Sequence, residues 1–324
     1  MVDPTGSHRL TLRSGGLTGT VVDNHDGLSG PEQIDRRARL PSAADGHGAL
    51  CCTVPFEERF NGYNGLARLQ YEDSCNPFVA SAAGHNCEFF FDRSDASFEP
   101  RWEGNKEHCL AQSSSLTSLS DTSARLTIDP GQRWGVQVES LFRLAVPYYV
   151  DIEHSFTPTD GAKLSDQVLG VFWASYIQVP RQPTFYFLAP GERWTSIYEA
   201  LDHYDPGVIA PECGPVGSRL ARQAAGRRLL YGIADTRYSQ PFFCGKVHGM
   251  LLSMMFRPAD DVEIRFAFNS VGGGPGAPAW DFQAVVADPH PGKRYSFETR
   301  TVYKSFEGFD EALELYRDWE RNEA

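Results

Sequence analysis

A carboxylate and an amide share one face of the segment 279–287, which reads AWDFQAVVA. Because neighbouring side chains of a β-strand point to opposite faces, Asp281 and Gln283 point one way and Trp280 points the other. A positioned carboxylate can act as a general base, and a neighbouring amide can orient a polar substrate. We therefore expect Asp281 to be a catalytic base, with Gln283 and Trp280 among the substrate-binding residues.

Two other side chains could complete an acid–base pair with Asp281. His154 lies on the apolar face of YYVDIEHSF, where burial would tune its pKa toward general acid or base use. Glu139, on the polar face of RWGVQVESLFRL, is the best-placed second carboxylate. The alternatives are a core role for His154 and a solvated or arginine-paired side chain for Glu139.

The segment GVFWASYIQV places Trp173 and Tyr176 on opposite faces of a strand. One of the two must face the core, and the other would offer a flat surface on which a sugar can stack. We favour Trp173 as the stacking residue. Arg265, on the polar face of VEIRFAFNS, could hold a substrate carboxylate with two hydrogen bonds or pair with its acidic neighbours.

His203 and His248 complete the candidate substrate-binding residues. His203 lies between Asp202 and Asp205 in ALDHYDP, and these types of side chain can bind a metal. The chain has no HxH or HExxH spacing, so we expect no metal.

The glycine-rich segment GGGPGAPAW is not a phosphate-binding loop. It has no lysine, and it leads into a strand where a phosphate loop would lead into a helix. Glycine and proline between alternating segments indicate a turn. The chain also lacks a GxSxG nucleophile motif, and we expect no cofactor.

The elements that must position these residues are predicted to be strands. Ten segments from ARLTID to RYSFETRTVYKSF have the two-residue alternation of β-strands. A short helix is expected in ERWTSIYEALDHY, and a terminal helix in FDEALELYRDWERNEA should pack against the sheet edge through residues 309, 313, 316 and 319 or 320. The pattern predicts an all-β protein, a large antiparallel sandwich with a short C-terminal helix. We expect residues 1–50 to be an arm or peripheral hairpin and residues 51–324 to be a single domain.

Composition narrows the set of partners. The formal net charge of −12 disfavours nucleic acid, and no apolar segment long enough to span a membrane is present. Together with the absence of a leader segment, these features favour a cytoplasmic protein. The seven cysteines have no CxxC spacing, so we expect reduced, mostly buried thiols.

The closing segment WDFQAVVADPHPGKRYSFETRTVYKSF resembles that of galactose-mutarotase-like β-supersandwich proteins. The matching residues are Asp281 and Gln283, Pro291, Gly292 and Tyr295, and Thr301, Tyr303 and Phe306. The resemblance implies a supersandwich in which the acid at position 281 is the catalytic base, with histidines opposite it. The chain departs from the family in having aspartate at this position and no recognisable Asn-His strand. Polysaccharide lyases and accessory domains of glycosidases share this fold, so the fold does not decide the reaction.

These features favour a carbohydrate-active enzyme that uses a carboxylate and a histidine for hydrolysis, β-elimination or epimerisation. The alternative is a non-catalytic carbohydrate-binding or scaffold protein. The two differ in whether Asp281 or Glu139 lies within about 5 Å of a histidine in a concave pocket. The expected ligand is a small molecule or an oligosaccharide, and the sequence does not set the oligomeric state.

Overall fold

The computed structural model describes residues 8–23, 63–79, 83–91, 113–131, 134–160, 162, 168–178, 181–202, 206–214, 231–274 and 276–322. These residues form three β-sheets and two helices, α2 (Ile197–Leu201) and α4 (Phe309–Arg321). The predicted all-β class with a short C-terminal helix is confirmed. Neither described helix is long and apolar enough to cross a membrane.

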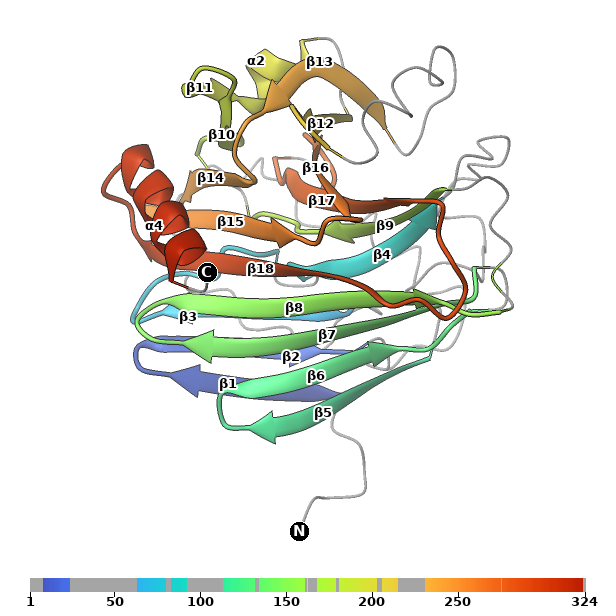
Figure 1. Ribbon diagram of the computed structural model, residues 1–324. Coiled ribbons are helices and arrows are strands. Elements are labelled where there is room, and N and C mark those ends of the chain that lie inside the picture. Colours follow the sequence, from blue (N-terminus) through green and yellow to red (C-terminus); the bar gives the residue numbers. More distant parts are fainter. Residues whose placement is uncertain are drawn as a thin grey trace.

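The largest sheet has nine strands in the order β11-β10-β14-β15-β18-β8-β7-β6-β5, and every neighbouring pair is antiparallel. Its strands curve through the front of the molecule (Figure 1). In chain order they are β5 (Ser114–Ser120), β6 (Ser123–Ile128), β7 (Val136–Ala145), β8 (Tyr149–Pro158), β10 (Tyr186–Ala189), β11 (Arg193–Ser196), β14 (Phe242–Val247), β15 (Met250–Pro258) and β18 (Tyr295–Ser305).

A six-stranded sheet and a three-stranded sheet form the second layer. The six-stranded sheet has the order β13-β12-β16-β17-β9-β4, and only its pair β12 and β13 is parallel. Its strands are β4 (Asn86–Phe91), β9 (Val168–Ala174), β12 (Gly207–Pro211), β13 (Gly232–Tyr238), β16 (Glu263–Asn269) and β17 (Ala279–Ala287). The three-stranded sheet contains β1 (Arg9–Ser14), β2 (Leu17–Val22) and β3 (Gly65–Tyr71), and a bridge between Leu66 and Gly84 joins the two.

The two layers pack face to face through the apolar side of each strand. In β7, alternate side chains from Val136 to Leu144 are buried, and in β17 the alternate side chains Trp280 and Phe282 belong to the same core cluster. The hairpin of β1 and β2 contributes Leu12 to this cluster, so the described part of the first 50 residues packs into the main core. The division of the chain at residue 50 stays a prediction.

The central strands of the six-stranded sheet are buried on both faces. All residues of β9, and all but the last residue of β16 and of β17, are buried. Strands of this kind lack polar-apolar alternation because neither face meets water. This explains why NCEFFF, the sequence of β4, was not among the predicted strands.

One expectation about cysteine is wrong. Cys75 is disulfide-bonded, although we expected reduced thiols. The described cysteines Cys87, Cys213 and Cys244 form no disulfide bond, and Cys87 and Cys244 are buried as expected. The spacing of cysteines along the chain carries no information on which ones the fold brings together, and this is why the disulfide was missed.

Helix α4 packs on the outer face of the nine-stranded sheet, where an edge contact was predicted. Its buried residues Ala312, Tyr316 and Trp319 share an apolar cluster with Phe242 and Val302 of the sheet. Outward-facing apolar side chains on β14, β15 and β18 form the surface that the helix covers. Figure 1 shows the helix lying against these strands. The helix therefore removes these apolar side chains of the outer face from water.

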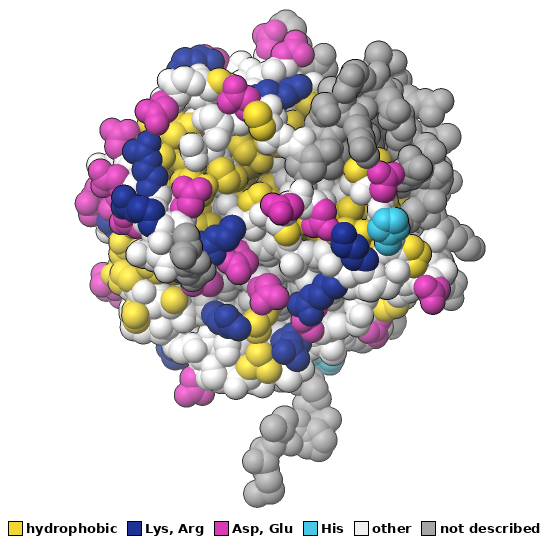
Figure 2. Space-filling model, in the orientation of Figure 1, with side chains coloured by type: hydrophobic (Ala, Val, Ile, Leu, Met, Phe, Trp, Pro, Cys, Tyr) yellow, Lys and Arg dark blue, Asp and Glu magenta, His cyan; other side chains and the backbone are white. Residues whose placement is uncertain are grey.

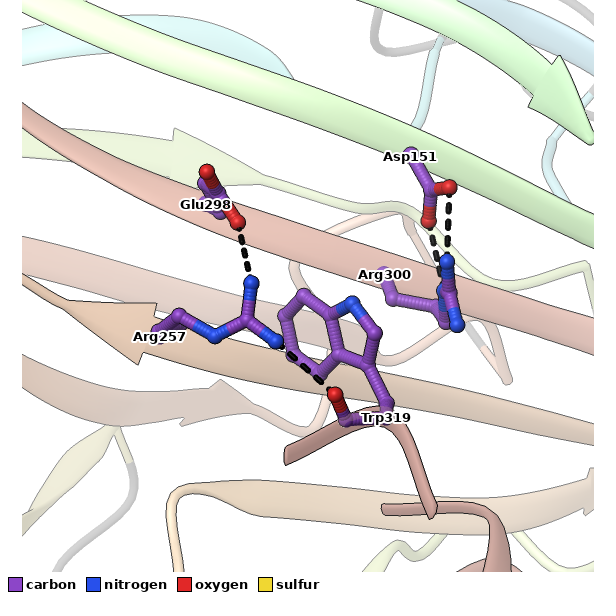
Figure 3. Close-up of polar contacts among 5 residues, drawn as sticks. All are labelled: Asp151, Arg257, Glu298, Arg300 and Trp319. Atoms are coloured by element: carbon purple, nitrogen blue, oxygen red, sulfur yellow. Dashed lines mark hydrogen bonds and ion pairs between the residues drawn. The ribbon is translucent and has the colours of Figure 1, made fainter. Parts of the chain in front are cut away.

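Two arginines hold the end of α4 to the sheet (Figure 3). The guanidinium groups of Arg257 and Arg300 lie 4.3 and 5.3 Å from the centre of the Trp319 ring. Arg300 donates two hydrogen bonds to Asp151, of 2.6 and 2.8 Å, and Arg257 donates to Glu298 and to the backbone carbonyl of Trp319. The carboxylates orient the guanidinium groups that contact the indole.

Trp319→Ala is expected to lower the free energy of unfolding by about 3 kcal/mol, because it removes a buried indole and leaves a cavity between helix and sheet. Urea unfolding followed by circular dichroism measures the change. Arg321→Ala is the matched control, since this side chain on the same helix is 72% exposed, and it should change stability by less than about 0.5 kcal/mol. Equal effects of the two substitutions would show that Trp319 does not anchor the helix.

Candidate functional site

Ionisable and amide side chains gather on the face of the six-stranded sheet that points away from the nine-stranded sheet. Four neighbouring strands, β4, β9, β17 and β16, supply them directly or from the residues that follow. They are Glu88, Tyr176, Glu263, Arg265, Asp281 and Gln283, and we call them the outer-face polar cluster. Each is at most 4% exposed. Burying such groups is costly unless they are paired, so a buried cluster of this size needs either a structural or a chemical reason.

One short contact within this cluster joins Tyr176 and Glu88. The Tyr176 hydroxyl donates to the Glu88 carboxylate, at 2.9 Å from Oε1 and 2.7 Å from Oε2. The ring of Tyr63 meets the ring of Tyr176 edge to face, with centroids 5.6 Å apart. A phenol bonded to both oxygens of a carboxylate is placed to share a proton with it.

Glu88 reaches this face because β4 contains an irregularity. The register of β4 on β9 shifts between Cys87 and Phe89, so Glu88 is the extra residue of a bulge. Sequence reasoning did not select Glu88. A single charge inside the apolar segment NCEFFF was the available signal, but the strand itself had not been recognised.

Arg265 and Glu263 form a buried ion pair on the next part of the face. Nε and Nη2 of Arg265 both lie 2.7 Å from Oε1 of Glu263, and the two side chains are 1% and 0% exposed. Gln283 is the cross-strand partner of Arg265, so its amide lies beside the guanidinium. Gly214 approaches so closely that a Cβ there would lie 2.6 Å from Oε2 of Glu263. Only glycine fits at that position without moving the carboxylate.

Asp281 is connected to the end of β9 and the start of β4. Its Oδ1 accepts a 2.9 Å hydrogen bond from the backbone N–H of Ser175. The hydroxyl of Ser175 accepts from the backbone N–H of His85 at 3.0 Å. His85 has a φ of +50°, an unusual conformation for a residue other than glycine. These hydrogen bonds thus link Asp281 on β17 to the residue after β9 and to the residue before β4.

Three of the predicted aromatic and histidine residues lie between the two layers. His154, Trp173 and Trp280 are all completely buried there. The expectation that Trp173 forms a stacking surface is corrected, because its ring packs against His154 at 5.0 Å and Phe282 at 5.4 Å. Tyr176, on the opposite face as predicted, is the residue of this pair that joins the polar cluster.

His154 is a core histidine in this structure. Ser140 lies 2.8 Å from its Nδ1, and the ring of His85 stacks on it with centroids 5.9 Å apart. Burial and the nearby His85 lower the pKa of His154 well below its ordinary value, and burial lowers the pKa of His85 to about 3. Both rings are therefore neutral near pH 7. His154 points from the nine-stranded sheet into the space between the layers, whereas Asp281 points from the six-stranded sheet away from that space, so the two do not form the expected pair.

Glu139 lies on the outer face of the nine-stranded sheet. Both sheets therefore lie between Glu139 and the outer-face polar cluster. Its carboxylate pairs with Arg125 at 3.4 Å and with Arg294 at 3.3 Å. Acidic and basic side chains alternate over this part of the surface (Figure 2). The structure therefore supports the alternative interpretation of Glu139, a solvated strand residue paired with arginine.

The two remaining predicted residues do not join the cluster. His248 occupies the turn between β14 and β15, where burial lowers its pKa and a hydrogen bond to the backbone of Gln178 opposes that shift. His203 lies outside the described residues. Within the described part of the chain, no group of three His, Cys, Asp or Glu side chains is arranged to hold a metal ion.

Comparisons with known proteins add little information about this site. No family model matches the chain, and no curated protein matches it. A heparinase III structure aligns with a TM-score of 0.43 and 6% identity, over 94% of this chain and 36% of that one. An aldose epimerase (GalM) homologue from C. elegans aligns with a TM-score of 0.40 and 11% identity, over 92% and 98%. At TM-scores this low neither likeness supports an inference about this chain, which covers less than half of the heparinase III chain.

The buried histidines predict a loss of stability in acid. Below the ordinary histidine pKa of 6.5, the unfolded chain binds protons that folded His85 and His154 do not bind. The free energy of unfolding should therefore decrease as pH falls from about 6.5 toward 4, by up to about 1.4 kcal/mol per pH unit for each histidine.

His154→Phe removes one of these two titrations and keeps an aromatic ring in the site. The slope of stability against pH between about 6 and 4 should become shallower by up to about 1.4 kcal/mol per pH unit. Denaturant unfolding at several pH values measures the slopes. His290→Gln is the control for losing a histidine at the surface. An unchanged slope in His154→Phe would mean that His154 is protonated in the folded protein.

Proposed function

We propose that this chain is a carbohydrate-active enzyme whose site is the outer-face polar cluster. The observation that carries the proposal is the Tyr176 hydroxyl bonded to both oxygens of Glu88, on the same buried face as Asp281 and Gln283. A phenol and carboxylates at one place can supply an acid and a base to a sugar. The fully buried histidines take no part in this chemistry.

Each member of the cluster has a role in this proposal. Asp281 takes a proton from the substrate, and Tyr176 donates one on the other side of the sugar while Glu88 holds the phenol. Gln283 and Arg265 bind substrate hydroxyl groups, since the charge of Arg265 is already balanced by Glu263. Epimerisation and β-elimination need one base and one acid in this way. Hydrolysis would use Asp281 and Glu88 as the carboxylate pair.

The alternative is a non-catalytic carbohydrate-binding protein. The observation that favours it is the burial of the whole cluster, because Glu88, Glu263 and Arg265 are 0–1% exposed. A buried ion pair can also serve to specify a fold. In that case ligands bind without turnover, and substitutions in the cluster change stability more than activity.

Four broader proposals accompany this function. Residues 51–324 form one domain, and the closing segment belongs to the galactose-mutarotase-like type. The ligand is a small sugar or oligosaccharide. The disulfide bond of Cys75 favours an oxidising compartment over the cytoplasm, because disulfides persist where thiols are not kept reduced.

A panel of monosaccharides and glycans, followed by NMR for anomeric exchange and new products, tests the proposed activity. Asp281→Asn should lower turnover by at least about 100-fold, because it removes the proposed base and keeps the oxygen that accepts from Ser175. The melting temperature should change little, since the substitution is isosteric. Near-normal turnover would make Asp281 a structural residue.

Tyr176→Phe and Glu88→Gln test the proposed acid, which is the Tyr176 hydroxyl held by Glu88. Each removes one proton-carrying group, so turnover should fall by about 10²-fold or more in both variants and the double variant should be no worse than either single one. Glu139→Gln is the matched control, because this carboxylate lies on the opposite side of the molecule. Additive losses in the double variant would contradict a shared proton.

A further inference from the structure

Four buried polar atoms between the two sheets have no hydrogen-bond partner among the described residues. They are Nδ1 of His85, Nε2 of His154, Nε1 of Trp173 and Oγ1 of Thr299. The four side chains are only 0–1% exposed. An unpaired buried polar atom costs free energy, and the large majority of such atoms in native proteins have a partner. Four of them in one region therefore indicate a partner that the protein itself does not supply.

Each of the two histidine rings has one nitrogen that is bonded and one that is not. Nε2 of His85 lies 2.7 Å from the hydroxyl of Thr301, and Nδ1 of His154 lies 2.8 Å from the hydroxyl of Ser140. The two imidazoles stack with centroids 5.9 Å apart, and the ring of Trp173 lies 5.0 Å from that of His154. A neutral imidazole has one donor and one acceptor nitrogen, so the second nitrogen of each ring needs a partner of its own.

Thr299 lies along β18 between the residues that contact the two histidines. Because alternate residues of a strand share a face, Phe297, Thr299 and Thr301 all point inward. The ring of Phe297 stacks on His154 with centroids 5.0 Å apart, and the hydroxyl of Thr301 contacts His85. The hydroxyl of Thr299 therefore reaches from the nine-stranded sheet into the region where each imidazole has an unpaired nitrogen.

We propose that this region is an internal water site, in which ordered water joins the two sheets. His85 precedes β4 and Trp173 lies on β9, whereas His154 and Thr299 come from β8 and β18, so both layers contribute polar atoms. Internal water molecules typically make about three hydrogen bonds to buried polar groups that have no other partner. The site lies on the opposite side of the six-stranded sheet from the outer-face polar cluster, so the inference is independent of the proposed carbohydrate activity.

The kinds of atom at the site favour water over an ion or a larger ligand. The indole N–H of Trp173 can only donate, and the described residues contain no group of three His, Cys, Asp or Glu side chains arranged to hold a cation. An anion would need a positive charge, whereas the imidazoles of His85 and His154 are neutral near pH 7. Burial of all four side chains leaves no exposed surface at which a larger ligand could enter. Water both donates and accepts, so it can pair with every atom of this set.

Thr299→Val tests the proposal through the sign of its effect on stability. The substitution replaces the hydroxyl with a methyl group and keeps the shape of the side chain. If the hydroxyl bonds to water, its loss should lower the melting temperature by about 1–3 °C. If the hydroxyl is unpaired, its removal should raise the melting temperature, because a desolvated polar group is replaced by an apolar one.

Thr301→Val is the matched control for this measurement. Thr301 lies on the same face of β18 and is equally buried, but its hydroxyl has a protein partner in His85. Its substitution should lower the melting temperature, and this result fixes the sign expected for a paired hydroxyl.

A high-resolution crystal structure of the natural chain is the second measurement. It should show ordered water within hydrogen-bonding distance of at least two of the four atoms. Either of two results would overturn the proposal. One is a melting temperature of Thr299→Val that equals or exceeds that of the natural chain, and the other is a crystal structure without water at these atoms.

Discussion

The contact between the inner faces of the two sheets is the constraint on which the rest of the structure depends. Rings from both layers meet there, including His154 and Phe297 of the nine-stranded sheet and Trp173 and Phe282 of the six-stranded sheet. Aromatic side chains bury large apolar areas, and edge-to-face geometries add to that gain. Once these residues point inward, every alternate residue on the same strands must point outward.

This constraint explains both outer faces. On β16 and β17 the outward residues are Arg265, Asp281 and Gln283, and these form part of the buried polar cluster. On β15 and β18 they include Arg257 and Arg300, which hold helix α4. The two outer faces therefore differ: one is a charged surface partly covered by a helix, and the other is buried and carries the polar cluster among apolar side chains such as Phe172 and Val285. Only the second has the desolvation that makes acid–base groups effective.

Polar groups buried between the two sheets have a different role. Ser140 and Thr301 bond to His154 and His85, and these contacts fix which way each ring faces. Hydrogen-bonded polar groups in an apolar core favour one packing arrangement over its competitors, because other arrangements would leave them unpaired. The two histidines therefore belong to the packing of the interior, and their neutrality suits a buried environment.

The sequence by itself determined which side chains share a face of each strand, because a β-strand alternates with a period of two residues whatever it packs against. It placed Asp281 with Gln283, Trp173 opposite Tyr176, and His154 on an apolar face. Only the tertiary structure decided which face meets which layer, that a bulge turns Glu88 toward Tyr176, and that Glu139 and His154 lie on opposite sides of one sheet. Strand order and register are set by contacts between residues far apart in the chain, and local periodicity carries no information about them.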